Sequence, residues 1–230
     1  MIRNYDDFCT ELLRCGFSMG GGHAKGIFAL IDFDWQVQEH IDTPIRWHCG
    51  DPDIDPWEWR MRVLEERDDI AYAKLFFGTS GFITKAWYPA FYAVRRKGET
   101  FDEAYEAGKI SHAAKRIYDV VAAGEVALHD VKSLAGFGRE DKSRFDRAMI
   151  ELQAGMYITM TGRRQKRNRY GAEYGWNSTA FATVEDFWRE RGFDVPDLNP
   201  EESYEAIRRQ ILLLNPHAEE KAVRKFITGA

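Results

Sequence analysis

One stretch decides the fold that this sequence predicts: Met156-Tyr-Ile-Thr-Met-Thr-Gly-Arg-Arg-Gln-Lys-Arg-Asn-Arg-Tyr-Gly171. In its first six residues, Met156, Ile158 and Met160 alternate with tyrosine and threonine. This two-residue period is typical of a β-strand with one buried face. Residues 179–183 have a similar composition, so we expect a return strand and a hairpin between the two.

The predicted hairpin tip, residues 162–171, is strongly basic. It holds five cations in seven positions, and no acid follows until Glu173. A tip with this charge indicates contact with phosphate groups, while a merely solvated basic loop is the alternative. The cations expected to bind nucleic acid here are Arg163, Arg164, Lys166, Arg167 and Arg169.

Three helices are predicted before the hairpin. Apolar residues recur at helical spacing in residues 110–121, 128–135 and 145–152, and a glycine follows each run. Three helices and a basic hairpin predict a winged helix-turn-helix domain over residues 100–192. In such domains the third helix usually enters the major groove and the wing contacts the backbone, so we expect double-stranded DNA as the partner.

The predicted third helix carries a second set of cations. Lys142, Arg144 and Arg147 are expected to contact nucleic acid. Four acids in the same stretch offset their charge, which argues against direct base readout; they are Glu140, Asp141, Asp146 and Glu151. Winged helices also serve as protein-binding scaffolds, and that alternative stays open.

Composition limits the class of protein. The chain has 230 residues, is 44% hydrophobic and carries a net charge of −5, so positive charge is local and any nucleic-acid contact is small and oriented. Cys9, Cys15 and Cys49 are too few and too irregular for a disulfide framework or a zinc site. No apolar run approaches the ~20 residues of a membrane span. We expect a cytoplasmic protein without metal or cofactor.

The N-terminal region, residues 1–99, is predicted to be helical with a small β-hairpin, which gives an α+β fold class for the chain. Asn4 and Asp55 are expected N-caps, and residues 78–81 are the expected turn of the hairpin. Residues 20–23 are expected to be a flexible connector. His48, Cys49, Asp51 and Asp53 match no metal-ligand spacing and predict a turn.

The C-terminal region, residues 193–230, is predicted to be a pair of helices. Asn199 is the expected cap of the first, and residues 215–220 begin the second. The pair is either a lid packed on the body or a dimerisation element. The oligomeric state stays open.

A family resemblance appears in the tryptophan-rich block of residues 47–59, the hairpin at 78–82, the segment 88–92 and the predicted winged helix. Together these stretches resemble the short bacterial relatives of the AlkZ winged-helix DNA glycosylases. The resemblance covers most of the chain, and the tryptophan block is its most specific part. The full glycosylases are longer, with tandem winged helices and a β-rich domain, so this chain is expected to lack part of that scaffold.

The resemblance implies excision of alkylated or crosslinked bases without a metal. The catalytic motif of those glycosylases is a Gln-apolar-Gln or Gln-apolar-Asp triplet, and this chain has Gln36-Val37-Gln38. A side-chain carbonyl can stabilise the positive charge that develops on the sugar and position the attacking water. Alternation would instead place both glutamines on one exposed strand face. Asp32, Asp34 and Glu39 are alternative bases.

Two further function classes remain. A transcription regulator would use the N-terminal region for sensing or dimerisation and the winged helix for DNA. A structural or interaction module would not bind nucleic acid. A glycosylase and a transcription regulator should both bind DNA with an affinity that falls as salt rises, whereas an interaction module should show no such binding.

Overall fold

The computed structural model describes residues 2–167 and 173–229. Contacts divide the chain into two compact units. Unit 1 is Met1–Lys97 with Pro196–Ala230, and unit 2 is Gly98–Val195. Both units combine helices with a three-stranded antiparallel sheet, which confirms the predicted α+β class. No helix in the described part of the chain is both long and apolar enough to cross a bilayer.

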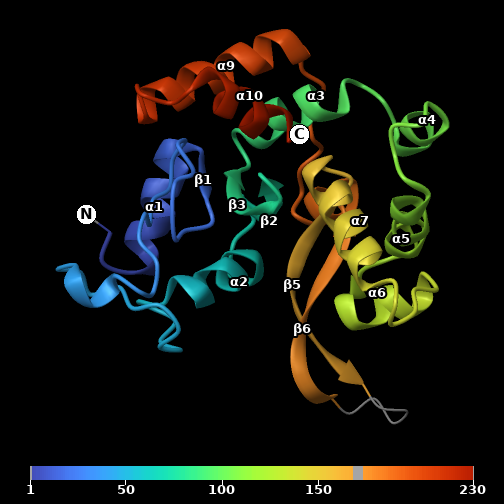
Figure 1. Ribbon diagram of the computed structural model, residues 1–230, viewed down its shortest axis with the longest axis horizontal. Coiled ribbons are helices and arrows are strands. Elements are labelled where there is room, and N and C mark those ends of the chain that lie inside the picture. The colour runs from blue at the N-terminus through green and yellow to red at the C-terminus, as the bar shows by residue number, and fades with distance from the viewer. Residues whose placement is uncertain (1, 168–172, 230) are drawn as a thin grey trace. The chain divides into compact units, whose positions relative to one another are not determined.

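Unit 1 packs helices around the sheet β1-β3-β2 (Figure 1). In chain order its elements are α1 (Tyr5–Cys15), β1 (Phe17–Met19), η1 (Gln38–His40), α2 (Pro56–Glu66), β2 (Ile70–Phe76), β3 (Thr79–Thr84), α3 (Tyr88–Arg96), α9 (Pro200–Leu214) and α10 (Glu220–Thr228). The N-caps Asn4, Asp55 and Asn199 confirm the corresponding predictions. The hairpin β2–β3 is present as predicted, but its turn is formed by Phe77 and Gly78 and not by residues 78–81, because Phe76 pairs with Thr79 and β3 begins there.

The two C-terminal helices pack back into unit 1. Phe226 of α10 stacks on Phe76 of β2, with ring centroids 3.8 Å apart and an interplanar angle of 7°. α9 packs against α3 and α10, and Gln210 of α9 donates a hydrogen bond to the carbonyl oxygen of Cys15. The start and the end of the chain therefore share one hydrophobic core.

Arg95 of α3 links β2 and α10 around this core through hydrogen bonds. Its guanidinium donates 2.9 Å hydrogen bonds to the carbonyl oxygens of Leu75, Phe226 and Ile227. The last two carbonyls belong to the final turn of α10, where no intrahelical donor is available. Burial lowers the pKa of Arg95 to about 10, which still leaves the guanidinium charged at neutral pH.

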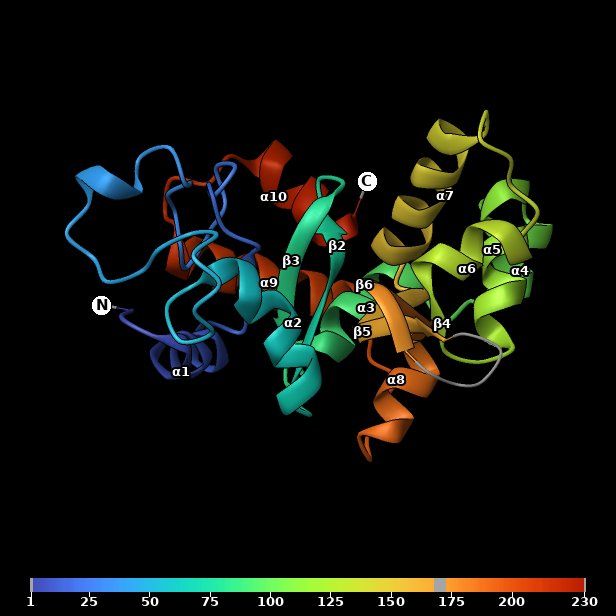
Figure 2. The ribbon, with the colours of Figure 1, turned by 90° about the horizontal axis from the view of Figure 1, so that it is seen from below.

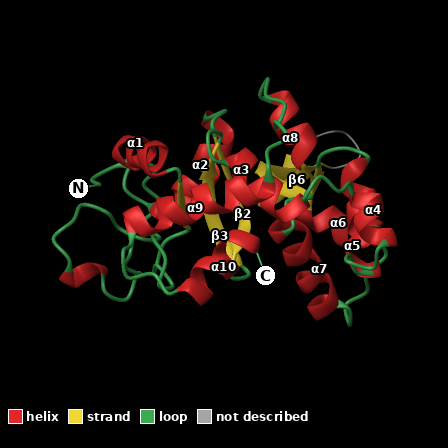
Figure 3. Cartoon of the chain, turned by 90° about the horizontal axis from the view of Figure 1, so that it is seen from above, coloured by secondary structure: helices red, strands yellow, loops and turns green. Residues whose placement is uncertain are grey.

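Unit 2 contains α4 (Phe101–Glu106), α5 (His112–Ala122), β4 (Val126–Ala127), α6 (Leu128–Leu134), α7 (Lys142–Ala154), β5 (Ile158–Arg167), β6 (Glu173–Thr183) and α8 (Val184–Glu190). Its sheet has the order β4-β6-β5. Figures 2 and 3 show α5, α6 and α7 on one side of this sheet and α8 on the other. α5, α6 and α7 are the three predicted helices.

The predicted hairpin tip is wrong in its extent. β5 continues to Arg167, so Arg163, Arg164, Lys166 and Arg167 lie in a paired strand rather than in a loop. Gly162, expected to begin the tip, has a φ of 144° and sits where the register shifts between Met160 and Gly162. A glycine at such a bulge lets the strand continue with a changed direction, which local composition does not reveal.

The strand proposed as the alternative for residues 32–40 is also wrong. Asp34 accepts the backbone N–H of Gln36 at 2.9 Å, which closes a turn, and the 3-10 helix η1 follows. Gln36 is exposed and Gln38 is half-buried, so the two do not share an exposed strand face.

We predict that Arg95→Met lowers the free energy of unfolding by about 2–3 kcal/mol, because the carbonyl oxygens of Leu75, Phe226 and Ile227 lose their donor while methionine keeps the apolar stem of the side chain. Urea unfolding followed by circular dichroism measures the change. The control is Arg14→Met, which removes an exposed ion pair to Glu11 and should cost less than about 1 kcal/mol. Equal effects of the two substitutions would contradict the role given to Arg95.

Candidate functional site

The predicted site residues lie in both units. Gln36 and Gln38 belong to unit 1, and seven of the eight predicted DNA-contacting cations belong to α7 and β5 of unit 2. The eighth, Arg169, lies outside the described residues.

The outer face of α7 presents two arginines without acidic partners. Arg144 and Arg147 are both exposed, and their spacing of three residues places them on the same helix face. No carboxylate among the described residues lies within ion-pair distance of either. Lys142 is also exposed, but its ammonium lies 3.8 Å from the carboxylate of Asp146. Arg144 and Arg147 are therefore the stronger candidates for an anionic partner.

Two of the acids expected to offset this charge accept hydrogen bonds from backbone N–H groups instead. Glu151 accepts hydrogen bonds from both the N–H and the hydroxyl of Ser111, at 2.7 Å each. Asp141 accepts the N–H of Gly138 at 2.9 Å in the turn before α7. Their charges still lower the local potential, but neither carboxylate pairs with a cation of α7.

The turn between α6 and α7 is held by Arg116 of α5. Its guanidinium donates to the carbonyl oxygens of Ala135 and Gly136 and lies 4.3 Å from the ring centroid of Phe137. Gly136 has a φ of 69°, and a Cβ there would lie 2.9 Å from the same guanidinium. This contact fixes the conformation of the turn that leads from α6 to α7. It also places Arg139, an exposed cation that sequence analysis missed, just before α7.

The cations of β5 are less available than their sequence suggests. Arg164 forms an ion pair with Glu125, with a nitrogen to oxygen distance of 2.7 Å, and Arg163 is half-buried. The backbones of Lys166 and Arg167 pair with β6, whereas their side chains and all of Arg169 lie outside the described residues. Glu125, which stands just before β4, could not be assigned as a partner from sequence distance alone.

In unit 1, the two glutamines play different parts. The Oε1 of Gln38 accepts the backbone N–H of Trp47 at 2.7 Å, so its carbonyl already holds the tryptophan loop. Gln36 is exposed, and its backbone N–H donates to the carboxylate of Asp34 at 2.9 Å. Asp32 accepts the N–H of Ala24 at 2.7 Å. The carboxylates of Asp32 and Asp34, which were alternative bases, thus accept backbone N–H groups within their own loop.

Asp55 organises the tryptophan loop of residues 47–57. Its buried carboxylate accepts N–H groups from His48, Gly50 and Trp57 at 3.0, 2.9 and 2.9 Å. The same carboxylate is the N-cap of α2. One side chain thereby sets both the loop and the helix that follows it.

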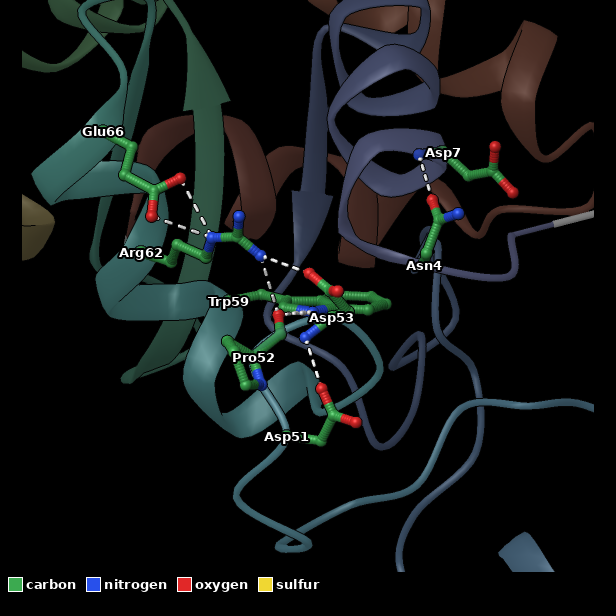
Figure 4. Close-up of polar contacts among 8 residues, drawn as sticks. All are labelled: Asn4, Asp7, Asp51, Pro52, Asp53, Trp59, Arg62 and Glu66. Carbon is green, nitrogen blue, oxygen red and sulfur yellow. Dashed lines mark hydrogen bonds and ion pairs between the residues drawn. The ribbon is translucent and has the colours of Figure 1, made fainter.

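A second network, centred on Arg62 of α2, supports the same loop (Figure 4). Arg62 donates to the carbonyl oxygen of Pro52 at 3.0 Å and to Asp53 and Glu66 at 2.9 Å. The indole N–H of Trp59 donates to the same Pro52 oxygen. Because Arg62 also lies 4.0 Å from the Tyr5 ring centroid, this network joins the loop to α1.

The loop also borders a pocket of about 220 Å³. Its wall includes Gly20, Gly21, Trp47, Trp57 and Tyr72. Residues 20–23, expected to be a flexible connector, are part of this wall rather than a free linker: the N–H of Gly20 donates to Ser80, and that of Gly22 to Ile31. In the described part of the chain, no three His, Cys, Asp or Glu side chains lie close enough to share a metal ion.

Comparison with known proteins identifies the family. A family model described as AlkZ related matches residues 2–228. The chain belongs to the AlkZ-related family. This confirms the resemblance seen in the sequence.

Other comparisons give less. One solved structure that this AlkZ-related protein matches is the Streptomyces sahachiroi DNA glycosylase AlkZ, with a TM-score of 0.41 and 11% identity. The match covers 77% of this chain and 51% of the glycosylase, so the chain spans about half the length of that protein. No curated protein sequence matches the chain.

We predict that Asp55→Asn destabilises the protein by about 2 kcal/mol, because an amide offers one acceptor oxygen and turns its NH₂ toward at least one of the three N–H groups that the carboxylate accepts. Urea unfolding followed by tryptophan fluorescence measures it. In the control, Asp51→Asn, the retained amide oxygen still accepts the N–H of Asp53, so stability should be unchanged. If Asp55→Asn were as stable as the control, the carboxylate would not organise the loop.

Proposed function

We propose that unit 2 is a winged helix-turn-helix domain that binds double-stranded DNA. Its element order supports this assignment, because α5, β4, α6 and α7 precede the ribbon β5–β6, and β4 pairs with β6. In this fold α7 corresponds to the recognition helix and the ribbon to the wing. Figure 1 shows the ribbon as a long element that continues beyond α7.

The observation that carries the proposal is the pair Arg144 and Arg147 on the exposed face of α7. Arginine is suited to phosphate because its planar guanidinium donates several N–H groups at once. Arg139 and Lys142 extend the positive charge toward the start of the helix. The backbone carries the affinity in such a contact, and the acids nearby disfavour extensive base readout.

We predict that the double substitution Arg144→Ala/Arg147→Ala weakens binding to duplex DNA irrespective of sequence. If each arginine neutralises one phosphate, the slope of log K against log[salt] falls by about 1.8, at roughly 0.9 per phosphate. Fluorescence anisotropy of a labelled duplex over a salt series measures the slope.

The matched control is Lys109→Ala/Arg189→Ala, which removes the same charge from cations paired with Glu99 and Asp186. This double variant should retain most of the slope. A slope that is the same for wild type and Arg144→Ala/Arg147→Ala would remove α7 from the interface.

We also infer that the chain acts on damaged bases in DNA, as its membership in the AlkZ-related family suggests. Hydrolysis breaks the N-glycosidic bond, whose electrons leave with the base, while water bonds to C1′ of the sugar and releases a proton to solvent. In this proposal the amide oxygen of Gln36 faces the developing positive charge and orients the water. Gln38 positions the tryptophan loop through its bond to Trp47.

We predict that the protein releases 7-methylguanine from duplex DNA and that Gln36→Ala abolishes the release. Scoring abasic sites in a single-turnover assay measures the rate. Gln38→Glu keeps an acceptor for the Trp47 N–H and should retain more activity than Gln38→Ala. Asp42→Ala, which removes an exposed carboxylate a few residues away, is the control and should be active.

The results separate two functions. Absence of release by the wild-type protein, with salt-dependent DNA binding intact, would contradict the glycosylase assignment and favour a DNA-binding regulator. Release that Gln36→Ala leaves unchanged would instead keep the enzyme and move its catalytic group elsewhere.

A further inference from the structure

The pocket of unit 1 combines aromatic rings with positive charge. Trp47, Trp57 and Tyr72 contribute rings, and Lys25 and Arg60 contribute cationic side chains. Among the described residues, no aspartate or glutamate lines the pocket. Such a surface favours a flat ligand that carries negative charge.

One cation and one ring of the pocket are already held together. The guanidinium of Arg60 lies 3.4 Å from the ring centroid of Trp57, and its Nε donates to the Trp57 carbonyl oxygen at 2.7 Å. Trp57 is nevertheless 43% exposed. Tyr72 is 5% exposed, and burial raises the pKa of its hydroxyl while hydrogen bonds with Ser80 and Arg60 oppose the rise. A ligand would meet a preorganised surface.

Close backbone approach builds the opposite wall. A Cβ at Gly21 would lie 2.7 Å from the ring of Trp47, and a Cβ at Gly20 would lie 2.7 Å from the carbonyl oxygen of Ser80. Glycine at both positions lets the loop pack beneath the indole. Any larger residue would have to move Trp47 or the β2–β3 hairpin.

Lys25 occupies a strained position at this pocket. Its φ is 48°, in the left-handed region where glycine is favoured. The side chain is exposed, and no described carboxylate lies within ion-pair distance of it. Strained residues cluster where a ligand is clamped, and this lysine adds charge to the pocket instead of relieving the backbone.

We propose that this pocket binds a single nucleotide unit, with the base against the rings of Trp47 and Trp57 and the phosphate at Lys25 and Arg60. Stacking of bases on aromatic side chains and pairing of phosphate with cations are the two interactions its lining offers. Its volume of about 220 Å³ is below the ~300 Å³ at which pockets for larger ligands begin, which favours one base over a dinucleotide.

The nucleotide unit has two sources. It is either a free nucleoside monophosphate or a nucleotide extruded from DNA, as enzymes that act on bases require. The second source rests on the proposed function, whereas the first is independent of DNA binding by unit 2.

The test is titration of the full chain with deoxyguanosine 5′-monophosphate, followed by tryptophan fluorescence and calorimetry. Lys25→Gln and Lys25→Gly should each weaken binding roughly tenfold, and Lys25→Arg should restore it. Lys25→Gly should keep its thermal stability because glycine accepts the left-handed backbone. Lys221→Gln, an exposed lysine of α10, is the control and should bind normally.

Deoxyguanosine should bind more weakly than its monophosphate. Four outcomes would overturn the proposal. They are no binding of the nucleotide, binding that the Lys25 variants leave unchanged, binding of inorganic phosphate alone with the same affinity, and binding of deoxyguanosine with the affinity of its monophosphate.

A duplex carrying 2-aminopurine distinguishes the sources. A fluorescence change that excess deoxyguanosine monophosphate reverses supports an extruded nucleotide, and binding of the free nucleotide without that change supports the free ligand. Arg144→Ala/Arg147→Ala should leave binding of the free nucleotide intact. Failure of DNA binding by unit 2 is thus measured separately from failure of the pocket.

Discussion

The candidate pocket depends on the hydrogen bonds that the carboxylate of Asp55 accepts from the backbone. This carboxylate is buried, yet three N–H groups surround it, so its desolvation is offset by hydrogen bonds rather than by a cation. Those bonds bend residues 48–50 around the start of α2, in the chain between Trp47 and Trp57, which both line the pocket. The ring of His48, whose N–H the carboxylate accepts, lies 6.2 Å from that of Trp47 and 4.9 Å from that of Trp57.

Charge is distributed differently in unit 2, where the fold decides which cations are available. β5 carries a high density of arginine and lysine, but Arg164 is occupied by Glu125. Residues 139–151 are neutral by composition, yet Glu151 and Asp141 accept hydrogen bonds from backbone N–H groups. The net charge of a segment is therefore a poor guide to the charge that it presents. The partners of each side chain determine the surface on which a phosphate could bind.

Features controlled by neighbouring residues were predictable from the sequence. The caps Asn4, Asp55 and Asn199 and the three helices of unit 2 follow from side chains within one helical turn. The pocket was not predictable, because Gly21 and Trp47 meet across 26 positions of chain and Gln38 holds Trp47 from a separate loop. The length of β5 was missed for a related reason, since pairing with β6 and a bulge at Gly162 override a composition typical of loops.

Both loops that line the pocket contain several residues with positive φ. Gly21, Gly22, Lys25 and Gly26 all have positive φ in one loop, as do His48 and Gly50 in the other. Glycine adopts such angles without steric cost, but Lys25 and His48 do not. His48 is compensated, because its N–H bonds to Asp55 and its ring lies 4.9 Å from that of Trp57. Lys25 has no comparable contact in the described chain, so the energy that holds it left-handed comes from the loop around it, and what it adds to the molecule is its charge at the pocket.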